Sequence, residues 1–304
     1  MRIVRDLENY SSDADLLLTI GVFDGVHIGH RAVLERLRVS RAPGTLAAAL
    51  TFERHPLAFL QPEKTPKALT TVSEKVNLLD ECGLDLLFLL PFDERIQRIG
   101  AREFLEDVLL KKLHARLLIV GSNWRFGHDR TGDVELAKAV LEPAGCGFEV
   151  ESLLTRDGQR VSSSRIRALI EERNFAEADE LLGAPFTLRG TVRGGDGRGH
   201  VLGVPTANLE LPAEKLVPPH GVYAARARYD GVDRDAVVSI GDKPTFGGHH
   251  DLAVEVHLLD FDRSIYGDQI AVWDWRLLRE QQRFESAAAL IDQMMRDIDA
   301  ARTH

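Results

Sequence analysis

The stretch Gly21-Val22-Phe23-Asp24-Gly25-Val26-His27-Ile28-Gly29-His30 decides how the first half of the chain is interpreted. Its first residues belong to the segment 15–23, which is typical of a buried strand. Its last residues begin the segment 28–39, where apolar residues recur at helical spacing. Glycines at such a turn let the backbone approach a ligand closely, and the start of a helix offers N–H groups to an anion. The stretch therefore predicts a phosphate site at a strand-to-helix turn. Its predicted ATP- and phosphate-binding residues are Gly21, Phe23, Asp24, Gly25 and Gly29.

Apolar runs and helical patterns alternate through the first half of the chain. The predicted strands are 15–23, 45–52, 84–90 and 116–121, and the predicted helices are 28–39, 73–82, 101–112 and 133–141. Alternation of this kind favours an open parallel α/β sheet of the Rossmann type. We expect Ser73 to be the N-cap of the helix that it begins.

The pattern changes near Phe186. From Thr187 onward, short strand-like runs are separated by Gly, Pro and Asp, with Asp230-Gly231 as a hairpin signal. These runs are 187–192, 222–229, 236–240, 252–259 and 269–275, and a helical pattern covers 286–301. The spacing predicts a small antiparallel barrel of about six strands closed by one helix. We therefore divide the chain into domains 1–186 and 187–304.

Composition and charge exclude several classes of protein. The chain has 304 residues, a length that suggests two domains. Acidic residues exceed basic ones in both halves, 29 against 24 in 1–186 and 18 against 14 in 187–304, which argues against a nucleic-acid surface. No apolar run approaches the roughly 20 residues that span a bilayer, and the N-terminus lacks the apolar core of a signal peptide. We expect a cytoplasmic enzyme that acts on small molecules, as a monomer or as a homo-oligomer.

His27 and His30 lie three residues apart at the start of the predicted helix, so they share one face of its first turn. Two imidazoles beside a helix N-terminus are suited to neutralise charge that develops on a phosphate in transfer, and we predict both as catalytic. A zinc site is disfavoured because no residue completes it at ligand spacing. The alternative is a pair of surface histidines after a loop.

The segment Ser162-Ser163-Ser164-Arg165-Ile166-Arg167 is a second candidate phosphate site. Serine hydroxyls, helix N–H groups and the planar fork of an arginine together suit a phosphate. We predict that the three serines and Arg167 bind ATP and that Arg165 is catalytic. Two anion sites at one sheet edge fit a nucleoside triphosphate held at both ends. Helix capping by the serines alone is the alternative.

A third candidate follows the predicted strand 116–121. Trp124 and Phe126 offer flat apolar surface for a ring, and Asn123 can read the ring's polar edge. The signal is weak by itself, because aromatic residues after a strand more often pack into a core.

The second domain opens on a Gly-dense loop, 194–200, that can wrap phosphates with backbone N–H groups. It lacks the Gly-Lys-Ser/Thr ending of a P-loop, and a long hairpin is the alternative. The predicted phosphate-binding residues here are Gly195, Gly197, Gly199, Gly203 and Pro205. Thr206 and Asn208 are two residues apart and share one face of a strand, where a hydroxyl and an amide oxygen could hold Mg²⁺.

Glu255 lies between Val254 and Val256, which would point to the opposite face of the strand. A carboxylate in a barrel strand needs a reason, because burying charge is costly. General-base work on a hydroxyl nucleophile is one such reason. An outward-facing strand glutamate is the alternative.

Together, these motifs resemble those of the bifunctional bacterial riboflavin kinase/FAD synthetases. The segments similar to the adenylyltransferase module are 21–30, 51–56, 69–75, 121–127 and 162–167. The segments similar to riboflavin kinase are 199–208, 221–224, 241 with 244–246, 255–261 and 266–267. The resemblance therefore covers nearly the whole chain.

The resemblance implies two reactions that consume ATP. The second domain would convert riboflavin to FMN, with Thr206 and Asn208 as ligands of Mg²⁺–ATP and Glu255 as the base for the ribityl hydroxyl. The first domain would convert FMN to FAD. The flavin-binding residues that it implies are Asn123, Trp124 and Phe126 in the first domain, and Arg279 and Phe284 in the second.

Three positions depart from the family's pattern. Val204 stands where the family usually has Phe, Ser239 where Asn is common, and Gln281 where Glu is expected. One alternative function is adenylyl transfer to another phosphate acceptor, with a non-catalytic barrel. Another is a flavin-sensing or RNA-binding module. The presence of Thr206, Asn208 and Glu255 argues against the first alternative, and the even acidic charge argues against RNA.

Overall fold

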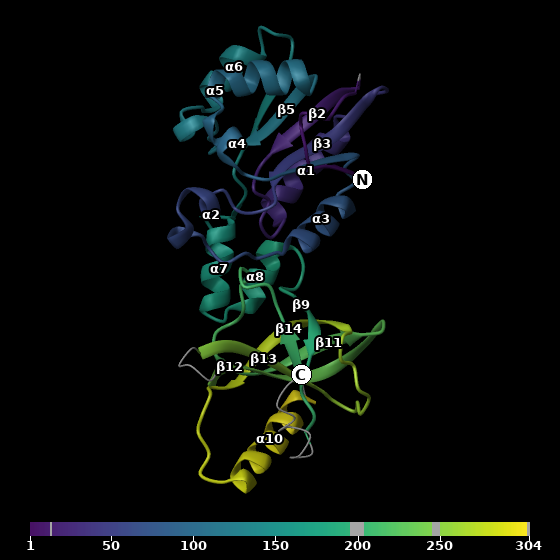
Figure 1. Ribbon diagram of the computed structural model, residues 1–304, viewed down its shortest axis with the longest axis vertical. Coiled ribbons are helices and arrows are strands. Elements are labelled where there is room, and N and C mark those ends of the chain that lie inside the picture. The colour runs from purple at the N-terminus through teal and green to yellow at the C-terminus, as the bar shows by residue number, and fades with distance from the viewer. Residues whose placement is uncertain (13, 195–203, 245–249, 303–304) are drawn as a thin grey trace. The chain divides into compact units, whose positions relative to one another are not determined.

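The protein, described here by a computed structural model, divides into two compact units, Met1–Ser163 and Ser164–His304 (Figure 1). The structure describes residues 1–12, 14–194, 204–244 and 250–302. No helix among these residues is both long and apolar enough to cross a membrane.

The first unit is built on a six-stranded sheet of order β1-β4-β3-β2-β5-β6, and every neighbouring pair is parallel. The strands are β1 (Arg2–Val4), β2 (Asp15–Ile20), β3 (Thr45–Phe52), β4 (Leu86–Leu90), β5 (Ala115–Gly121) and β6 (Gly147–Glu151). After β4 the chain crosses back to the other side of β2 and continues as β5. The crevice between the carboxyl ends of β2 and β5 is therefore the topological switch point, where open α/β sheets bind ligands.

Helices cover both faces of this sheet. The helical segments are α1 (Ile28–Val39), α2 (Leu57–Leu60), η1 (Pro62–Lys64), α3 (Val72–Glu81), α4 (Glu94–Arg98), α5 (Ala101–Glu103), η2 (Phe104–Lys112), η3 (His128–Arg130) and α6 (Val134–Leu141). A short hairpin, β7 (Thr155–Arg156) and β8 (Gln159–Arg160), completes the unit.

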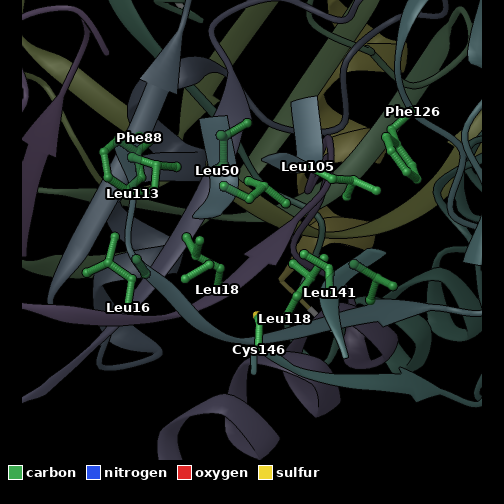
Figure 2. Packing of buried hydrophobic residues seen from close by; sticks show 14 of the residues in the cluster. Leu16, Leu18, Leu50, Phe88, Leu105, Leu113, Leu118, Phe126, Leu141 and Cys146 are labelled. Atoms are coloured by element: carbon green, nitrogen blue, oxygen red, sulfur yellow. The ribbon is translucent and has the colours of Figure 1, made fainter. Parts of the chain in front are cut away.

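Alternating side chains of the central strands feed two separate cores. Leu16, Leu18 and Phe88 pack on one face, against Leu105 of η2 and Leu141 of α6 (Figure 2). The residues between them in sequence pack on the other face, against α1 and α3. Burial on both faces explains why β2, β3 and β4 are nearly continuous apolar runs.

The second unit contains a closed antiparallel barrel of order β10-β13-β12-β11-β14-β9. Its elements are α7 (Ser163–Glu171), α8 (Phe175–Leu182), β9 (Leu188–Arg193), β10 (Ala207–Glu210), β11 (Gly221–Tyr229), β12 (Val232–Pro244), β13 (His250–Leu258), β14 (Gln269–Arg279) and α10 (Ala287–Ala301). Ile298 and Ala301 of α10 pack on the outside of the barrel, in one cluster with Ala224 and Leu259. The predicted fold class, a parallel α/β domain and a six-stranded barrel with a terminal helix, is confirmed.

The structure corrects several local expectations. The first strand ends at Ile20 rather than Phe23. The N-cap of α3 is Thr71 instead of Ser73, because Thr71 and Glu74 form a reciprocal capping box. The expected helix 101–112 becomes π-helical from Phe104 onward. The short strands β1 and β6 were not predicted as elements, because their few residues give too little pattern to find them. Strand β10 begins at Ala207, so Thr206, which we expected on the same strand as Asn208, lies just before it.

Candidate active sites

The turn between β2 and α1 has an unusual backbone. Phe23, Gly25 and Val26 all have positive φ, at 52°, 81° and 39°. For a β-branched residue such as Val26 this conformation is an outlier, and such strain persists only where the surroundings hold it. Strained turns of this kind cluster at functional sites, which agrees with the phosphate site predicted here.

Asp24 fixes the turn through hydrogen bonds to the segment that precedes α3. Its buried carboxylate accepts from the backbone N–H groups of Leu69 and Thr70, both at 3.1 Å. The hydroxyl of Thr70 donates to the same carboxylate at 3.2 Å and accepts from the N–H of Gly25 at 3.1 Å. Asp24 is therefore a structural anchor of the turn.

His27 and His30 lie together at the start of α1. Their rings stack with centroids 3.6 Å apart, and Nδ1 of His27 caps the helix by accepting from the N–H of His30 at 3.3 Å. Because Nδ1 accepts, the proton of a neutral His27 ring lies on Nε2. His30 also contacts the ring of Phe23 edge-on, with centroids 5.1 Å apart. The structure thus brings the two predicted catalytic histidines into one cluster.

Both histidines are neutral near neutral pH. Burial lowers the pKa of His27 to about 4. Burial, the neighbouring His27 and the charge of Lys75 lower the pKa of His30 well below its usual value. The rings can therefore donate hydrogen bonds to a phosphate without carrying a positive charge of their own.

The serine motif is divided between the two compact units. Ser163 donates its hydroxyl proton to the carbonyl of Asp24 at 2.9 Å. It is therefore hydrogen-bonded to the segment 21–30, which carries His27 and His30 and is called the histidine turn below. Ser162 precedes it in the first unit, and Ser164, Arg165 and Arg167 lie on α7 in the second. Arg165 forms an ion pair with Glu177 of α8.

The aromatic residues after β5 stack on each other, with the rings of Trp124 and Phe126 4.0 Å apart. Phe126 is buried in the core beside Phe104, so the packing alternative holds for its ring. Trp124 is only half-buried and Asn123 is exposed. Trp124 and Asn123 are therefore the members of this motif that a ligand can reach.

In the barrel, strand register aligns four predicted or flagged residues. Asn208 of β10 lies directly opposite Glu255 of β13, and Glu255 lies opposite Ser239 of β12. The row continues through Val222 of β11 to Arg279 of β14. Directly opposed residues share one face of a sheet. The predicted metal ligand and the predicted base are thus neighbours.

Glu255 lies half-buried on the face opposite to the buried Val254 and Val256. It borders an open cavity of about 490 Å³. Among the described residues, this cavity is lined by His220, Ser239, Gly241, Asp242, Ala253, Glu255, Gln281, Gln282 and Arg283. Glu255 therefore points outward from the barrel, as in the alternative of an outward-facing strand glutamate, and it borders a space that a ligand can occupy.

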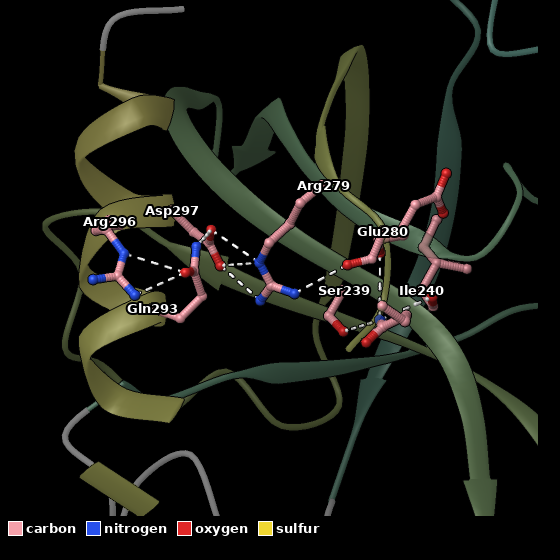
Figure 3. Close-up of polar contacts among 9 residues, drawn as sticks. Ser239, Ile240, Arg279, Glu280, Gln293, Arg296 and Asp297 are labelled. Atoms are coloured by element: carbon pink, nitrogen blue, oxygen red, sulfur yellow. Dashed lines mark hydrogen bonds and ion pairs between the residues drawn. The ribbon is translucent and has the colours of Figure 1, made fainter. Parts of the chain in front are cut away.

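Two of the residues that depart from the family's pattern, Ser239 and Gln281, contact each other at this cavity. The Gln281 amide donates to the Ser239 hydroxyl at 3.0 Å and to the carbonyl of Ile240 at 3.1 Å (Figure 3). Gly241 leaves room for this amide, because a Cβ there would lie 3.2 Å from it. Two of the three departures from the family's pattern are thus in direct contact.

The segment of the barrel predicted to bind phosphate, 195–205, is described by the structure only from residue 204. Pro205 is exposed and its carbonyl lies 2.8 Å from Nδ1 of His257, while Thr206 is half-buried. The predicted Gly195, Gly197, Gly199 and Gly203 lie outside the described residues. No group of three or more His, Cys, Asp or Glu among the described residues could hold a metal ion.

Arg279 connects the barrel to α10. Its guanidinium binds both carboxylate oxygens of Asp297, at 2.8–3.1 Å, and Gln293 donates to the same carboxylate (Figure 3). The guanidinium also lies 5.6 Å from the centre of the Phe284 ring. Arg279 thus holds both the terminal helix and the segment that carries Phe284.

Replacing Asp297 by Ala is expected to destabilise the barrel unit by about 3–5 kcal/mol, because it leaves the charge of Arg279 without its partner in a largely buried place. The Asp297 side chain is 6 % exposed and that of Arg279 is 18 % exposed. Urea unfolding monitored by Trp fluorescence measures the change. Asp292→Ala, at an exposed position of the same helix, is the control and should change stability little. Equal stability of the two variants would contradict the structural role of this pair.

Known proteins match both parts of the chain. A family model described as FAD synthetase matches residues 10–165, and one described as riboflavin kinase matches residues 182–304. A protein of Escherichia coli K12, described as a bifunctional riboflavin kinase/FMN adenylyltransferase, is 38% identical and aligns over 99% of this chain and 97% of its own. The chain belongs to the bifunctional riboflavin kinase/FMN adenylyltransferase family. A relative described in the same words from Bacillus subtilis is 32% identical over 93% of this chain and 90% of its own.

A crystal structure of another protein has the same fold as this chain. It is described as a macrolide-efflux protein from Streptococcus pneumoniae, with a TM-score of 0.88 and 28% identity, and the match covers 100% of this chain and 99% of that one. The description belongs to the pneumococcal protein, and the likeness establishes the common fold. The FAD synthetase match contains the histidine turn, and the riboflavin kinase match contains Glu255 and its cavity.

Sequence patterns missed some residues at both sites. His220 precedes β11, and Gln282 and Arg283 follow β14; they share a cavity because these strands pair in the barrel. Only knowledge of the strand order could have found them. Lys75 was noted within a family-like segment, but nothing in its spacing indicated a buried ammonium beside the histidine turn.

Proposed function

We propose that the barrel transfers the γ-phosphoryl group of ATP to the 5′-hydroxyl of riboflavin. A bond forms between the ribityl oxygen and the γ-phosphorus while the bond from that phosphorus to the bridging oxygen of ADP breaks. Glu255 accepts the hydroxyl proton. The observation that carries this assignment is the register that sets Glu255 opposite Asn208 beside a cavity. In-line phosphoryl transfer needs mainly positioning and charge stabilisation, with a base for the hydroxyl.

The histidine turn is the proposed site of adenylyl transfer to FMN. An oxygen of the FMN phosphate attacks the α-phosphorus of ATP, and pyrophosphate leaves. No base is required, because the attacking phosphate is already an anion. His27 and His30 donate hydrogen bonds to the phosphates. The resemblance to the family assigns Arg165 and Arg167 to the same reaction, as suppliers of positive charge, since the planar guanidinium suits phosphate. Asn123 and Trp124 contact the flavin ring, with Phe126 behind Trp124.

Mg²⁺ fits the donor set of the barrel. The Thr206 hydroxyl and the Asn208 amide oxygen are hard oxygen donors, which this ion prefers. When bound, the ion would neutralise charge on the transferred phosphoryl group. Thr206 and Asn208 would hold the ion. Arg279 and Phe284 are the residues proposed to contact the flavin in this unit.

The boundary between the two functions is proposed to lie after Phe186. The match to the riboflavin kinase model begins close to this point, at residue 182, whereas the division into compact units lies earlier, between Ser163 and Ser164. The reactants make this a cytoplasmic enzyme of small molecules in our proposal.

Asn208→Ala is expected to raise the Mg²⁺ concentration needed for half-maximal FMN formation by about tenfold or more, because one oxygen ligand is lost. Conversion of added FMN to FAD by the same preparation should keep its Mg²⁺ dependence. Removing divalent ions with EDTA should stop both reactions until Mg²⁺ is restored. Glu210→Gln, two residues further along β10 and exposed, is the matched control. An unchanged Mg²⁺ dependence of FMN formation would remove Asn208 from the metal site.

A further inference from the structure

A buried lysine from α3 lies beside the histidine turn. Lys75 is 5% exposed, and its Nζ donates to the carbonyl of Phe52 at 2.6 Å and to that of Val22 at 3.4 Å. Phe52 is the last residue of β3, and Val22 directly precedes the first positive-φ residue of the turn. The ammonium therefore joins the end of β3 to the turn that follows β2.

This tie acts on the part of the turn that Asp24 does not hold. The Asp24 carboxylate fixes the turn to Leu69 and Thr70. At Val22, the same carbonyl accepts from Lys75 and from the hydroxyl of Thr51 at 3.0 Å. The strained residues Phe23 and Val26 are thus held from both sides, as a conformation of high local energy requires.

Lys75 also supplies charge where the histidines have none. Burial lowers its pKa to about 8, while the carboxylates of Asp24 and Glu53 act in the opposite direction. At neutral pH most of the lysine is therefore protonated. Its charge is in turn one of the causes that keep the neighbouring His30 neutral.

We propose that Lys75 is a positioning residue for adenylyl transfer, whose ammonium holds Val22 and Phe52 together and so fixes the turn that carries His27 and His30. The inference rests on the assignment of adenylyl transfer to that turn. Lys75 affects the reaction only through the backbone of the turn.

Lys75→Met in the full-length chain tests this role, because Met keeps an apolar stem of similar length and removes the ammonium. We expect kcat for FAD formation from added FMN to fall on the order of 10–100-fold, the scale of a small misplacement of catalytic groups. FMN formation from riboflavin by the same preparation should be unchanged, which shows that the barrel unit is intact, and thermal unfolding checks that the first unit is folded. Lys64→Met, at an exposed lysine of η1, is the matched control.

The pH profile separates this role from mere packing and needs no variant to fold. In the unsubstituted protein, FAD formation should decline as the pH rises through about 8, because deprotonation of Lys75 weakens the tie. The decline should be absent from the residual activity of Lys75→Met and from FMN formation. A flat wild-type profile between about pH 7 and 10, or wild-type FAD formation by Lys75→Met, overturns the proposal. If His30→Ala also forms FAD normally, the assignment of the turn itself is wrong; if only Lys75→Met does, the turn stands and Lys75 has no part in it.

Discussion

Glu255→Gln is expected to lower the rate of FMN formation from riboflavin by about 10²–10⁴-fold, the usual contribution of a general base. The amide has nearly the same size as the carboxylate but cannot accept the proton of the attacking hydroxyl. Glu255 lies on the cavity-facing side of β13, whereas Val254 and Val256 carry the packing of that strand. The substitution should therefore leave the fold intact.

The same variant should convert added FMN to FAD at the wild-type rate, because the adenylyl site lies in a different part of the chain. Chromatographic separation of riboflavin, FMN and FAD after incubation with ATP and Mg²⁺ measures both rates in one preparation. Glu210→Gln, an exposed glutamate of β10, is the matched control and should retain both activities. Loss of both products in Glu255→Gln would contradict the division of labour, and normal FMN formation would remove Glu255 as the base.

His30→Ala is expected to have the opposite effect, with FAD formation reduced by about 10²–10³-fold, as when one donor to a developing negative charge is removed. The ring of His30 stacks on His27 and contacts Phe23, so its loss also frees the neighbouring histidine. FMN should still form from riboflavin, and it should accumulate because the next step is blocked. Phosphate and flavin analysis over time reports the accumulation directly.

His114→Ala provides a control for His30→Ala, since His114 is an exposed histidine of the same unit that precedes β5. It should retain both activities. Thermal unfolding of the two variants checks that the loss arises from chemistry and not from melting of the first unit. An unaffected FAD yield in His30→Ala would exclude His30 from the mechanism.

Sequence patterns were sufficient for the elements with strong periodicity. The helix 28–39 and the strand 45–52 have the predicted bounds, because apolar spacing and flanking turn residues agree there. The histidine turn was located for a similar reason, since its glycines and histidines stand at a strand-to-helix junction. Short strands such as β1 and β10, by contrast, are defined by their partners in the sheet.

The state of the candidate sites depends on contacts between residues far apart in the sequence. Burial lowers the pKa of both histidines, and the neighbouring His27 and Lys75 of another helix lower that of His30 further. The row from Asn208 to Arg279 exists only because the barrel closes with one particular register. The ion pair between Arg279 and Asp297 requires α10 to pack on the outside of the barrel. None of these contacts leaves a local pattern in the sequence.

The most direct test of the two-site account is a time course with the unaltered protein, riboflavin, ATP and Mg²⁺. The account predicts that FMN and ADP appear first, and that FAD and pyrophosphate follow as FMN is consumed. FAD formation from added FMN without any product from riboflavin would contradict a working kinase site and would implicate Val204, Ser239 and Gln281. Absence of both products would contradict the account as a whole.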